Sequence, residues 1–423
     1  MHPDREALER LQLERLNALL AAVWEGNSFY ANKLNGTPRS YTSLADFRGA
    51  IPVTEKHELV ADQNAHPPFG TNLTYPIERY SRFCQTSGTT ARPMRWLDTP
   101  ETWSWMLDCW TRVLLASGVT PTDRLFFPFS FGPFLGLWAA FDAAARLGCL
   151  AIPGGGMRSS ARLRMILDNG VTALCATPTY TIHLAETAHA EGIDLTASQV
   201  RRIIVAGEPG GSIPVTRARI EQLWPGARVY DHHGMTEIGP VSYECPARRG
   251  VLHIIEQAYL PEVVDPETLQ PIAPGELGEL LLTNLGRTGS PLLRYRTRDF
   301  VRRGAAEPCA CGSFEMALEG GILGRTDDMV VIRGVNIYPS AVEEIVRAEP
   351  EVAEFRVEVC DGDALSELRI QVEPMPATQD PAALAARLQE ALRAAFALRI
   401  AVEAVSPDAL PRFELKAKRW VKA

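Results

Sequence analysis

Residues 202–231, RIIVAGEPGGSIPVTRARIEQLWPGARVYD, show the pattern that decides the fold of this chain. A short apolar run leads into a polar loop with glycines, then into a segment with helical spacing, and then into a second apolar run at 228–231. Strands that are apolar on both faces and alternate with helices indicate a parallel sheet covered by helices. In such sheets, ligands bind beyond the carboxyl ends of the strands. The same alternation extends towards the N-terminus, with apolar runs at 125–129, 149–153, 173–177 and 202–206 and helical patterns at 135–147, 159–169, 180–191 and 214–224.

The sequence changes in character after residue 250. Shorter strands separated by turns follow, for example at 278–283 and 292–298. We therefore predict an α/β fold class with a large N-terminal domain over 1–326, in which a mainly parallel sheet is joined by a strand-rich subdomain. A small α+β C-terminal domain is predicted over 327–423, with helices from about 339 and over 381–396, and with strands near 355–360 and 368–372.

The composition is typical of a globular enzyme and excludes several other classes. Of the 423 residues, 46% are hydrophobic and 22% are charged, and at ~100–200 residues per domain this length predicts two or three domains. A net charge of −8 without a basic run argues against a nucleic-acid surface. Residues 1–26 carry acids throughout and predict a packing helix, not a secretion signal, and no apolar stretch approaches the ~18 residues of a membrane span. Eight scattered cysteines favour a reducing cytoplasm.

Hydroxyl residues cluster around a glycine at 86–93, TSGTTARP. Backbone N–H groups and hydroxyls in such a loop converge on phosphate oxygens. The alternative is a solvated turn, because Ser, Thr and Gly are the common loop residues. The segment lacks the Walker pattern, but it resembles the phosphate loop of adenylate-forming enzymes, [ST]-S-G-T-T-G-x-P. Ala91 replaces the second glycine of that motif, and Arg92 stands where Lys is common.

Further segments resemble motifs of the same family and occur in its order. AGEPG at 206–210 resembles the adenine-side loop, and YDHHGMTE at 230–237 resembles Y-G-x-[ST]-E with His233 at the tyrosine position. YRTRD at 295–299 matches Y-x-T-x-D, and GRTDD at 324–328 opens the hinge block. Any one of these alone would be interpreted as a turn or a surface ion pair. Together they make the chain similar to adenylate-forming enzymes, above all to the phenylacetate–coenzyme A ligase branch.

This resemblance implies a set of site residues. Thr236 would contact the α-phosphate, Glu237 would hold Mg²⁺, and Asp299 would bind the ribose hydroxyls. LPRFELKAKR at 410–419 resembles the closing motif of the family, P-R-[ST]-x-G-K-x-x-R, with Leu415 at the glycine position. The motif implies Lys416 as the catalytic lysine, whose charge would stabilise the phosphate in the first step. Lys418 is a rival, because the glycine that usually fixes the register is missing. The C-terminal domain would be mobile and would rotate about the hinge residue Asp327. The implied nucleotide-binding residues are Thr86, Ser87, Gly88, Thr89, Thr90, Gly207, Glu208, Pro209, Asp231, His232, His233, Gly234, Met235, Thr236, Asp299 and Arg325.

Three cysteines and a histidine form a candidate metal site. These residues are Cys245, His253, Cys309 and Cys311. Three thiolates and one imidazole are a tetrahedral zinc set, and four protein ligands make the zinc structural and not catalytic. The alternative is that they are small buried residues, as free cysteines commonly are. Cys84, Cys109, Cys149 and Cys175 lie in apolar contexts and fit that alternative.

The acid-binding pocket is predicted at an aromatic segment. Phe129, Phe131, Phe134 and Trp138 would line it, and their density favours an aryl or arylacetic acid. The family implies ATP, Mg²⁺ and coenzyme A as cofactors: ATP and the acid give an acyl-adenylate and pyrophosphate, and a thiol then displaces AMP. Two alternatives stay open, namely transfer to an acyl carrier protein or amine, and a non-catalytic homologue that binds nucleotide. A homodimer is also possible.

Overall fold

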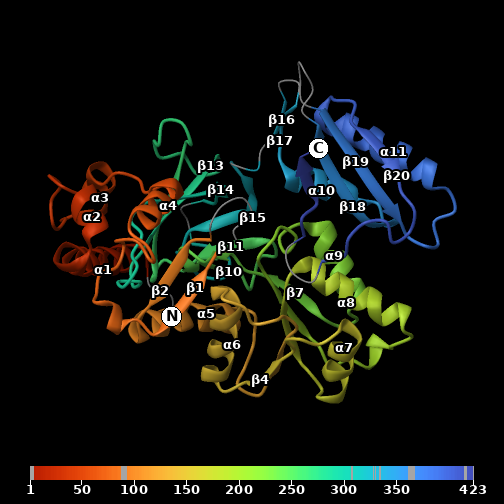
Figure 1. Cartoon of the computed structure of the whole chain (residues 1–423), viewed down its shortest axis with the longest axis horizontal. Coiled ribbons are helices and arrows are strands. Elements are labelled where there is room, and N and C mark those ends of the chain that lie inside the picture. The colour runs from red at the N-terminus through yellow and green to blue at the C-terminus, as the bar shows by residue number, and fades with distance from the viewer. Residues whose placement is uncertain are drawn as a thin grey trace.

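The computed structural model describes residues 4–86, 93–305, 308–326, 328, 330–332, 335–360, 367–413 and 417–422 (Figure 1). Within these residues, five strands pair in parallel in the order β4-β3-β5-β6-β7. The strands are β3 (Arg124–Phe127), β4 (Leu150–Pro153), β5 (Ala173–Ala176), β6 (Arg202–Val205) and β7 (Arg228–Asp231). Every apolar run assigned to this sheet forms a strand in it, so the predicted α/β class is confirmed.

Helices cover both faces of the parallel sheet. Phe127 belongs to the same core as Trp110 of one helical layer, whereas its neighbour Phe126 belongs to the core that contains Trp224 of the other layer. Successive side chains of a strand point to opposite faces, so strands covered on both sides must be apolar at consecutive positions. One layer holds α5 (Pro100–Ala116) and α6 (Leu135–Leu147), and the other holds α7 (Ser159–Asp168), α8 (Pro178–Ala190) and α9 (Pro214–Leu223).

For two of the strands whose bounds differ from the prediction, the structure shows a local reason. The run at 125–129 leaves the sheet after Phe127, because Pro128 has no N–H to continue a ladder. The strand predicted at 292–298 begins at Tyr295, because Arg294 has a φ of 45° and interrupts the extended backbone. The helix predicted over 381–396 has the predicted bounds.

A second sheet is antiparallel and stands beside the first. Of the strands that the structure describes, it contains six in the order β10-β11-β15-β14-β13-β12. They are β10 (Ser242–Glu244), β11 (Val251–Ile254), β12 (Tyr259–Val264), β13 (Leu277–Asn284), β14 (Tyr295–Arg303) and β15 (Ala317–Arg325). The N-terminal helices pack at its edge, where Leu16 and Leu20 share a core with Leu260. These helices are α1 (Arg5–Gly26), α2 (Ser28–Lys33), α3 (Leu44–Ala50) and α4 (Lys56–Ala65). Among the described helices, none combines the length and apolarity of a membrane span.

The C-terminal part has its own sheet and its own core. Its strands run in the order β20-β19-β18-β21, with β18 (Val352–Cys360), β19 (Glu367–Pro374), β20 (Ala401–Ala404) and β21 (Trp420–Lys422). Helices α10 (Pro339–Ala348) and α11 (Pro381–Phe396) pack on it, and the hairpin β16 (Val330–Ile332) and β17 (Val335–Ile337) precedes them. This unit lies against α8 and α9 (Figure 1), and the Arg219 side chain of α9 donates from Nη1 to the carbonyl oxygen of Val352 across 2.9 Å.

Candidate active site

Two of the family-like loops follow neighbouring parallel strands. The loop at 206–210 follows β6, and the segment at 230–237 follows from the end of β7; the two strands pair with Val205 opposite Asp231. Gly210 has a φ of 142°, and a Cβ at this position would lie 2.7 Å from Pro178, so only glycine lets the first loop pack against the start of α8. Both loops therefore lie at the carboxyl edge of the sheet, where ligands of such folds bind.

Asp299 connects the second loop to the antiparallel sheet. Its carboxylate is 3% exposed and accepts from His233 Nε2 at 3.0 Å. Arg325, its register partner on β15, donates from Nη1 to the other carboxylate oxygen at 3.4 Å. Three segments that the sequence placed in one nucleotide site are thus in direct contact. His233, at the usual tyrosine position, orients Asp299, the residue predicted to bind the ribose, because its imidazole N–H can donate to a carboxylate. The sequence alone did not indicate this role.

The backbone of the Thr236–Glu237 turn is fixed by a buried ion pair. Arg287 Nη1 donates to the carbonyl oxygens of Thr236 and Glu237, both at 2.8 Å. The same guanidinium binds Asp98 with two hydrogen bonds of 2.8 and 2.7 Å, and both side chains of the pair are fully buried. Sequence reasoning missed Arg287 and Asp98, which are 189 residues apart and belong to no motif. It also missed Lys56, whose ammonium lies 3.1 Å from Glu237 Oε1.

His232, a residue of the second loop, is buried and is neutral at pH 7. Its ring centroid lies 4.3 Å from that of Trp110, and its Nδ1 lies 2.7 Å from the carbonyl oxygen of Ser242. Burial lowers the pKa of His232 to about 4, although the Ser242 carbonyl acts in the opposite direction. The preceding residue, Asp231, accepts a hydrogen bond from the Ser212 hydroxyl, and burial raises the pKa of its carboxyl. These side chains shape the loop and do not point to acid–base catalysis.

Part of the predicted site lies outside the described residues, namely Ser87, Gly88, Thr89, Thr90, Asp327 and Lys416. The stem of the predicted phosphate loop is described. There β1 (Arg82–Gln85) pairs with β2 (Arg95–Asp98), and the Thr86 hydroxyl accepts from the Met94 N–H at 3.1 Å. The Gln85 N–H donates to the carbonyl oxygen of Pro133 at 2.7 Å, which places this stem beside the aromatic segment.

The aromatic segment forms a connected ring cluster. Phe131 lies 5.4 Å from Phe129 and 4.8 Å from Trp138, measured between ring centroids. Trp138 Nε1 donates to the carbonyl oxygen of Gly132 at 2.9 Å, which fixes the loop before α6. Phe129 is a core residue, whereas Phe131, Phe134 and Trp138 are half-buried. The half-buried members are the ones available to an acid.

The structure brings the four candidate zinc ligands together. The ligand atoms of Cys245, His253, Cys309 and Cys311 all lie within 4.8 Å of one another. Cys245 Sγ is 3.6 Å from Cys309 Sγ, and Cys311 Sγ is 3.5 Å from His253 Nε2. His253 Nδ1 is 3.1 Å from the carbonyl oxygen of Glu315, so the tautomer that donates from Nδ1 carries its lone pair on Nε2, the atom that lies beside the Cys311 thiol. Cys245 directly follows β10, His253 lies on β11, and Cys309 and Cys311 lie before β15.

Comparisons with known proteins agree with this geometry. The family model described as AMP-binding enzyme matches residues 78–286, and the AMP-binding enzyme C-terminal domain matches residues 334–423. The chain is 34% identical over 375 residues to the phenylacetate-coenzyme A ligase of Thermus thermophilus, covering 87% of this chain and 82% of that protein. A solved 2-hydroxyisobutyryl-CoA ligase in the postadenylation state, with 2-HIB-AMP, gives a TM-score of 0.94 at 28% identity and covers 100% of this chain and 91% of its own.

The same ligase in its thioesterification state, with 2-HIB-AMP and CoA, gives a TM-score of 0.73 at 29% identity, with coverage of 98% and 89%. Coverage and identity hardly change between the two comparisons, so the difference lies in how the parts are arranged. The N-terminal and C-terminal parts of this chain are therefore arranged as in the postadenylation structure.

Proposed function

This chain belongs to the AMP-binding enzyme family and is an AMP-forming acid–coenzyme A ligase, and we propose that its acid is an aryl or arylacetic acid. In the first half-reaction the acid carboxylate attacks the α-phosphate of ATP, giving acyl-adenylate and pyrophosphate. In the second, the thiol of coenzyme A displaces AMP and forms the thioester. The observation that carries the proposed site is the contact of Asp299 with both His233 and Arg325 at the carboxyl edge of the parallel sheet.

Each described residue has a part in binding and orientation. Asp299 has two acceptor oxygens for the ribose hydroxyls, held in place by its two cationic or polar neighbours. Thr236 would contact the α-phosphate, and Arg287 holds its turn by donating to the Thr236 carbonyl oxygen. The Glu237 carboxylate would hold a Mg²⁺ shared with substrate phosphates, since such ions use one or two carboxylates. The ion would have to displace the Lys56 ammonium, which lies 3.1 Å from Glu237 Oε1. When bound, the ion would neutralise phosphate charge.

The choice of acid rests on the half-buried rings. Phe131 and Trp138 offer flat apolar surface close to the stem of the phosphate loop. A phenyl ring would stack there, whereas a short aliphatic acid would leave this surface wet. The test is pyrophosphate release across aryl, arylacetic and aliphatic acids, with coenzyme A or a phosphopantetheinyl carrier protein as acceptor. Faster turnover of short aliphatic acids would contradict the proposed acid, and preference for the carrier would contradict the acceptor.

We also propose that the chain works as two units, residues 1–326 and 327–423, with Asp327 as hinge and Lys416 as the catalytic lysine. The rival Lys418 is exposed in the present arrangement. Lys416→Ala should abolish adenylate formation and spare thioester formation from supplied acyl-adenylate. A larger first-step loss in Lys418→Ala would reverse the assignment.

Finally, we propose that Cys245, His253, Cys309 and Cys311 hold one structural Zn²⁺. The donor set and the clustering of its ligand atoms support this. All four positions are taken by protein, so the metal would stabilise the antiparallel sheet and would not touch substrate.

A further inference from the structure

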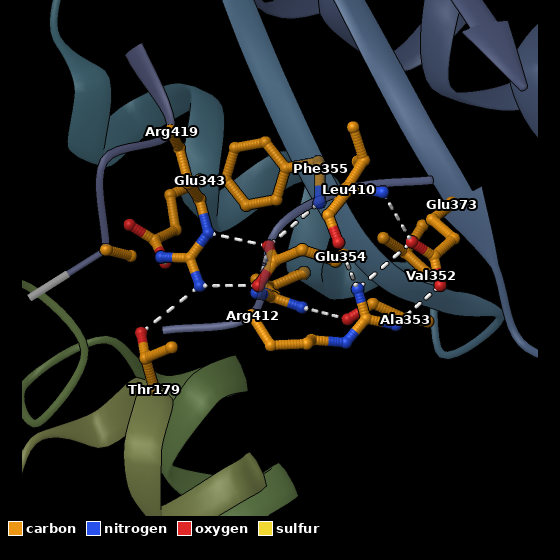
Figure 2. Close-up of polar contacts among 12 residues, drawn as sticks. Thr179, Glu343, Val352, Ala353, Glu354, Phe355, Glu373, Leu410, Arg412 and Arg419 are labelled. Atoms are coloured by element: carbon orange, nitrogen blue, oxygen red, sulfur yellow. Dashed lines mark hydrogen bonds and ion pairs between the residues drawn. The ribbon is translucent and has the colours of Figure 1, made fainter. Parts of the chain in front are cut away.

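The residues that follow the predicted lysine are bound to the N-terminal domain at two points. The Ala417 N–H donates to Glu208 Oε2 at 2.8 Å. Two residues later, Arg419 Nη2 donates to the Thr179 hydroxyl at 3.1 Å (Figure 2). The Thr179 N–H in turn donates to the other carboxylate oxygen of Glu208, also at 2.8 Å. The three hydrogen bonds form a closed ring between the domains, which we call the clasp (Glu208, Thr179, Ala417 and Arg419).

On the N-terminal side, the clasp is built on rigid elements. Thr179 is the second residue of α8, where N–H groups have no partner inside the helix. Glu208 satisfies one of them and places its negative charge at the positive end of the helix. Gly210 packs this loop against Pro178, so the carboxylate is held in a fixed position. With one oxygen fixed on α8, the other is aimed at Ala417.

On the C-terminal side, Arg419 is oriented before it reaches Thr179. Glu354 binds it through Nε at 2.7 Å and Nη2 at 3.1 Å, and Glu343 binds Nη1 at 3.2 Å. Its guanidinium lies 5.1 Å from the Phe355 ring centroid (Figure 2), and the residue is 6% exposed. These partners all belong to the C-terminal domain. Because these partners restrict the rotamers of Arg419, whether its hydrogen bond to Thr179 forms depends mainly on where the C-terminal domain is placed.

On the other side of Lys416 in the sequence, Arg412 is held within the C-terminal domain. Arg412 Nη1 donates to Glu373 Oε2 at 3.0 Å and to the carbonyl oxygen of Leu410 at 3.1 Å (Figure 2). These contacts are thus inside the C-terminal domain. The contact of Ala417, one residue beyond Lys416, is with the N-terminal domain through Glu208.

We propose that Glu208 and Thr179 are positioning residues for the first half-reaction, because they hold the segment that carries Lys416 against the N-terminal domain. This rests on the proposed function of Lys416. Rotation of the C-terminal domain separates both donors from their acceptors, so the clasp stabilises one arrangement and not the other. Glu208 thereby acts through the C-terminal segment that begins at Ala417. This role is additional to the position beside the adenine that its motif implies.

The test compares two threonines of the same helix. Thr179→Val keeps the shape and removes the acceptor of Arg419. Thr181→Val makes the same change at a hydroxyl that binds only the Thr177 carbonyl oxygen of α8 among described residues, and it serves as the matched control. We expect Thr179→Val to lower kcat for acid-dependent pyrophosphate release by roughly tenfold to a hundredfold, as for a lost hydrogen bond to a charged group. The KM for ATP and the rate of thioester formation from supplied acyl-adenylate should not change.

A second readout does not depend on activity. Amide hydrogen exchange in the peptide that contains Ala417 should be faster in Thr179→Val and in Glu208→Gln, which leaves one acceptor oxygen for two N–H donors. Thr181→Val should exchange like wild type. Unchanged exchange in both variants, or parallel loss of both half-reactions, would overturn the clasp. If exchange is faster in the two variants but the wild-type protein releases no pyrophosphate with any acid tested, the clasp is upheld and the proposed function is refuted.

Discussion

Replacing Arg287 by methionine should damage stability and adenylation through one set of contacts. The guanidinium makes four hydrogen bonds, two to the Asp98 carboxylate and one each to the carbonyl oxygens of Thr236 and Glu237. Methionine has a similar length but no donor. The carboxylate is then left buried and unpaired, since its remaining described side-chain partner is the Thr102 hydroxyl at 3.1 Å.

The size of the effect follows from the full burial of the pair. Removing one partner of such a pair costs about 3–5 kcal/mol of unfolding free energy, because an uncompensated charge remains in a low dielectric. This is a large share of the ~5–15 kcal/mol that keeps a typical domain folded. Urea unfolding measures it, and Trp96, whose ring centroid lies 5.2 Å from the guanidinium carbon, is a local fluorescent reporter.

A second variant separates stability from positioning. In Asp98→Leu/Arg287→Met both charges are gone, and an apolar pair of similar volume often restores stability. The carbonyls of the Thr236–Glu237 turn still lack their donor, so acid-dependent pyrophosphate release should stay low in the refolded double variant. The reasoning is refuted if the single variant loses less than about 1 kcal/mol, or if the double variant recovers wild-type adenylation.

Three further predictions concern the metal cluster, the buried histidine and the ribose ligand. The purified protein should contain about one zinc per chain, with Zn–S distances near ~2.3 Å by X-ray absorption; equal zinc in a Cys309→Ser/Cys311→Ser variant would refute the site. Because burial lowers the pKa of His232 to about 4 from 6.5, the unfolded chain binds a proton that the folded chain does not. Stability should therefore fall by roughly 3 kcal/mol as pH drops from about 6.5 to about 4, and a His232→Asn variant that keeps the same pH slope would contradict this. Asp299→Ala should weaken ATP binding by about tenfold or more in calorimetry, as for lost hydrogen bonds to a charged group, and unchanged affinity would remove Asp299 from the nucleotide site.

The sequence predicted those parts of the molecule whose determinants are local. Each parallel strand is apolar over a few consecutive residues, and the motifs at 206–210 and 230–237 come at the ends of β6 and β7, so chain order alone puts these two loops at one edge of the sheet. The four candidate metal ligands, which the structure brings together, were also grouped from sequence, because cysteine and histidine are few enough to be matched by type across a gap of 64 residues between Cys245 and Cys309.

Contacts between common residues far apart in the chain could not be predicted in this way. Asp98 and Arg287 are an ordinary acid and an ordinary base until the fold buries them together. Lys56 likewise follows a loop with no motif, and its contact with Glu237 arises from the packing of α4. His233 was recognised as a departure from the family pattern, but its pairing with Asp299 depends on how the two sheets meet.

The loop at 206–210 shows how one short motif can link nucleotide binding to the position of a domain. Its backbone follows β6 at the carboxyl edge, where the nucleotide is proposed to bind, while the Glu208 side chain reaches α8 and Ala417. Gly210 packs the loop onto Pro178, so the carboxylate keeps its position relative to the Thr179 N–H of α8. A flexible loop would let the carboxylate drift away from Ala417, whereas one fixed at the glycine presents it to that N–H in a constant position. This gives a physical reason for a glycine and a carboxylate to stand two positions apart at this point of the chain.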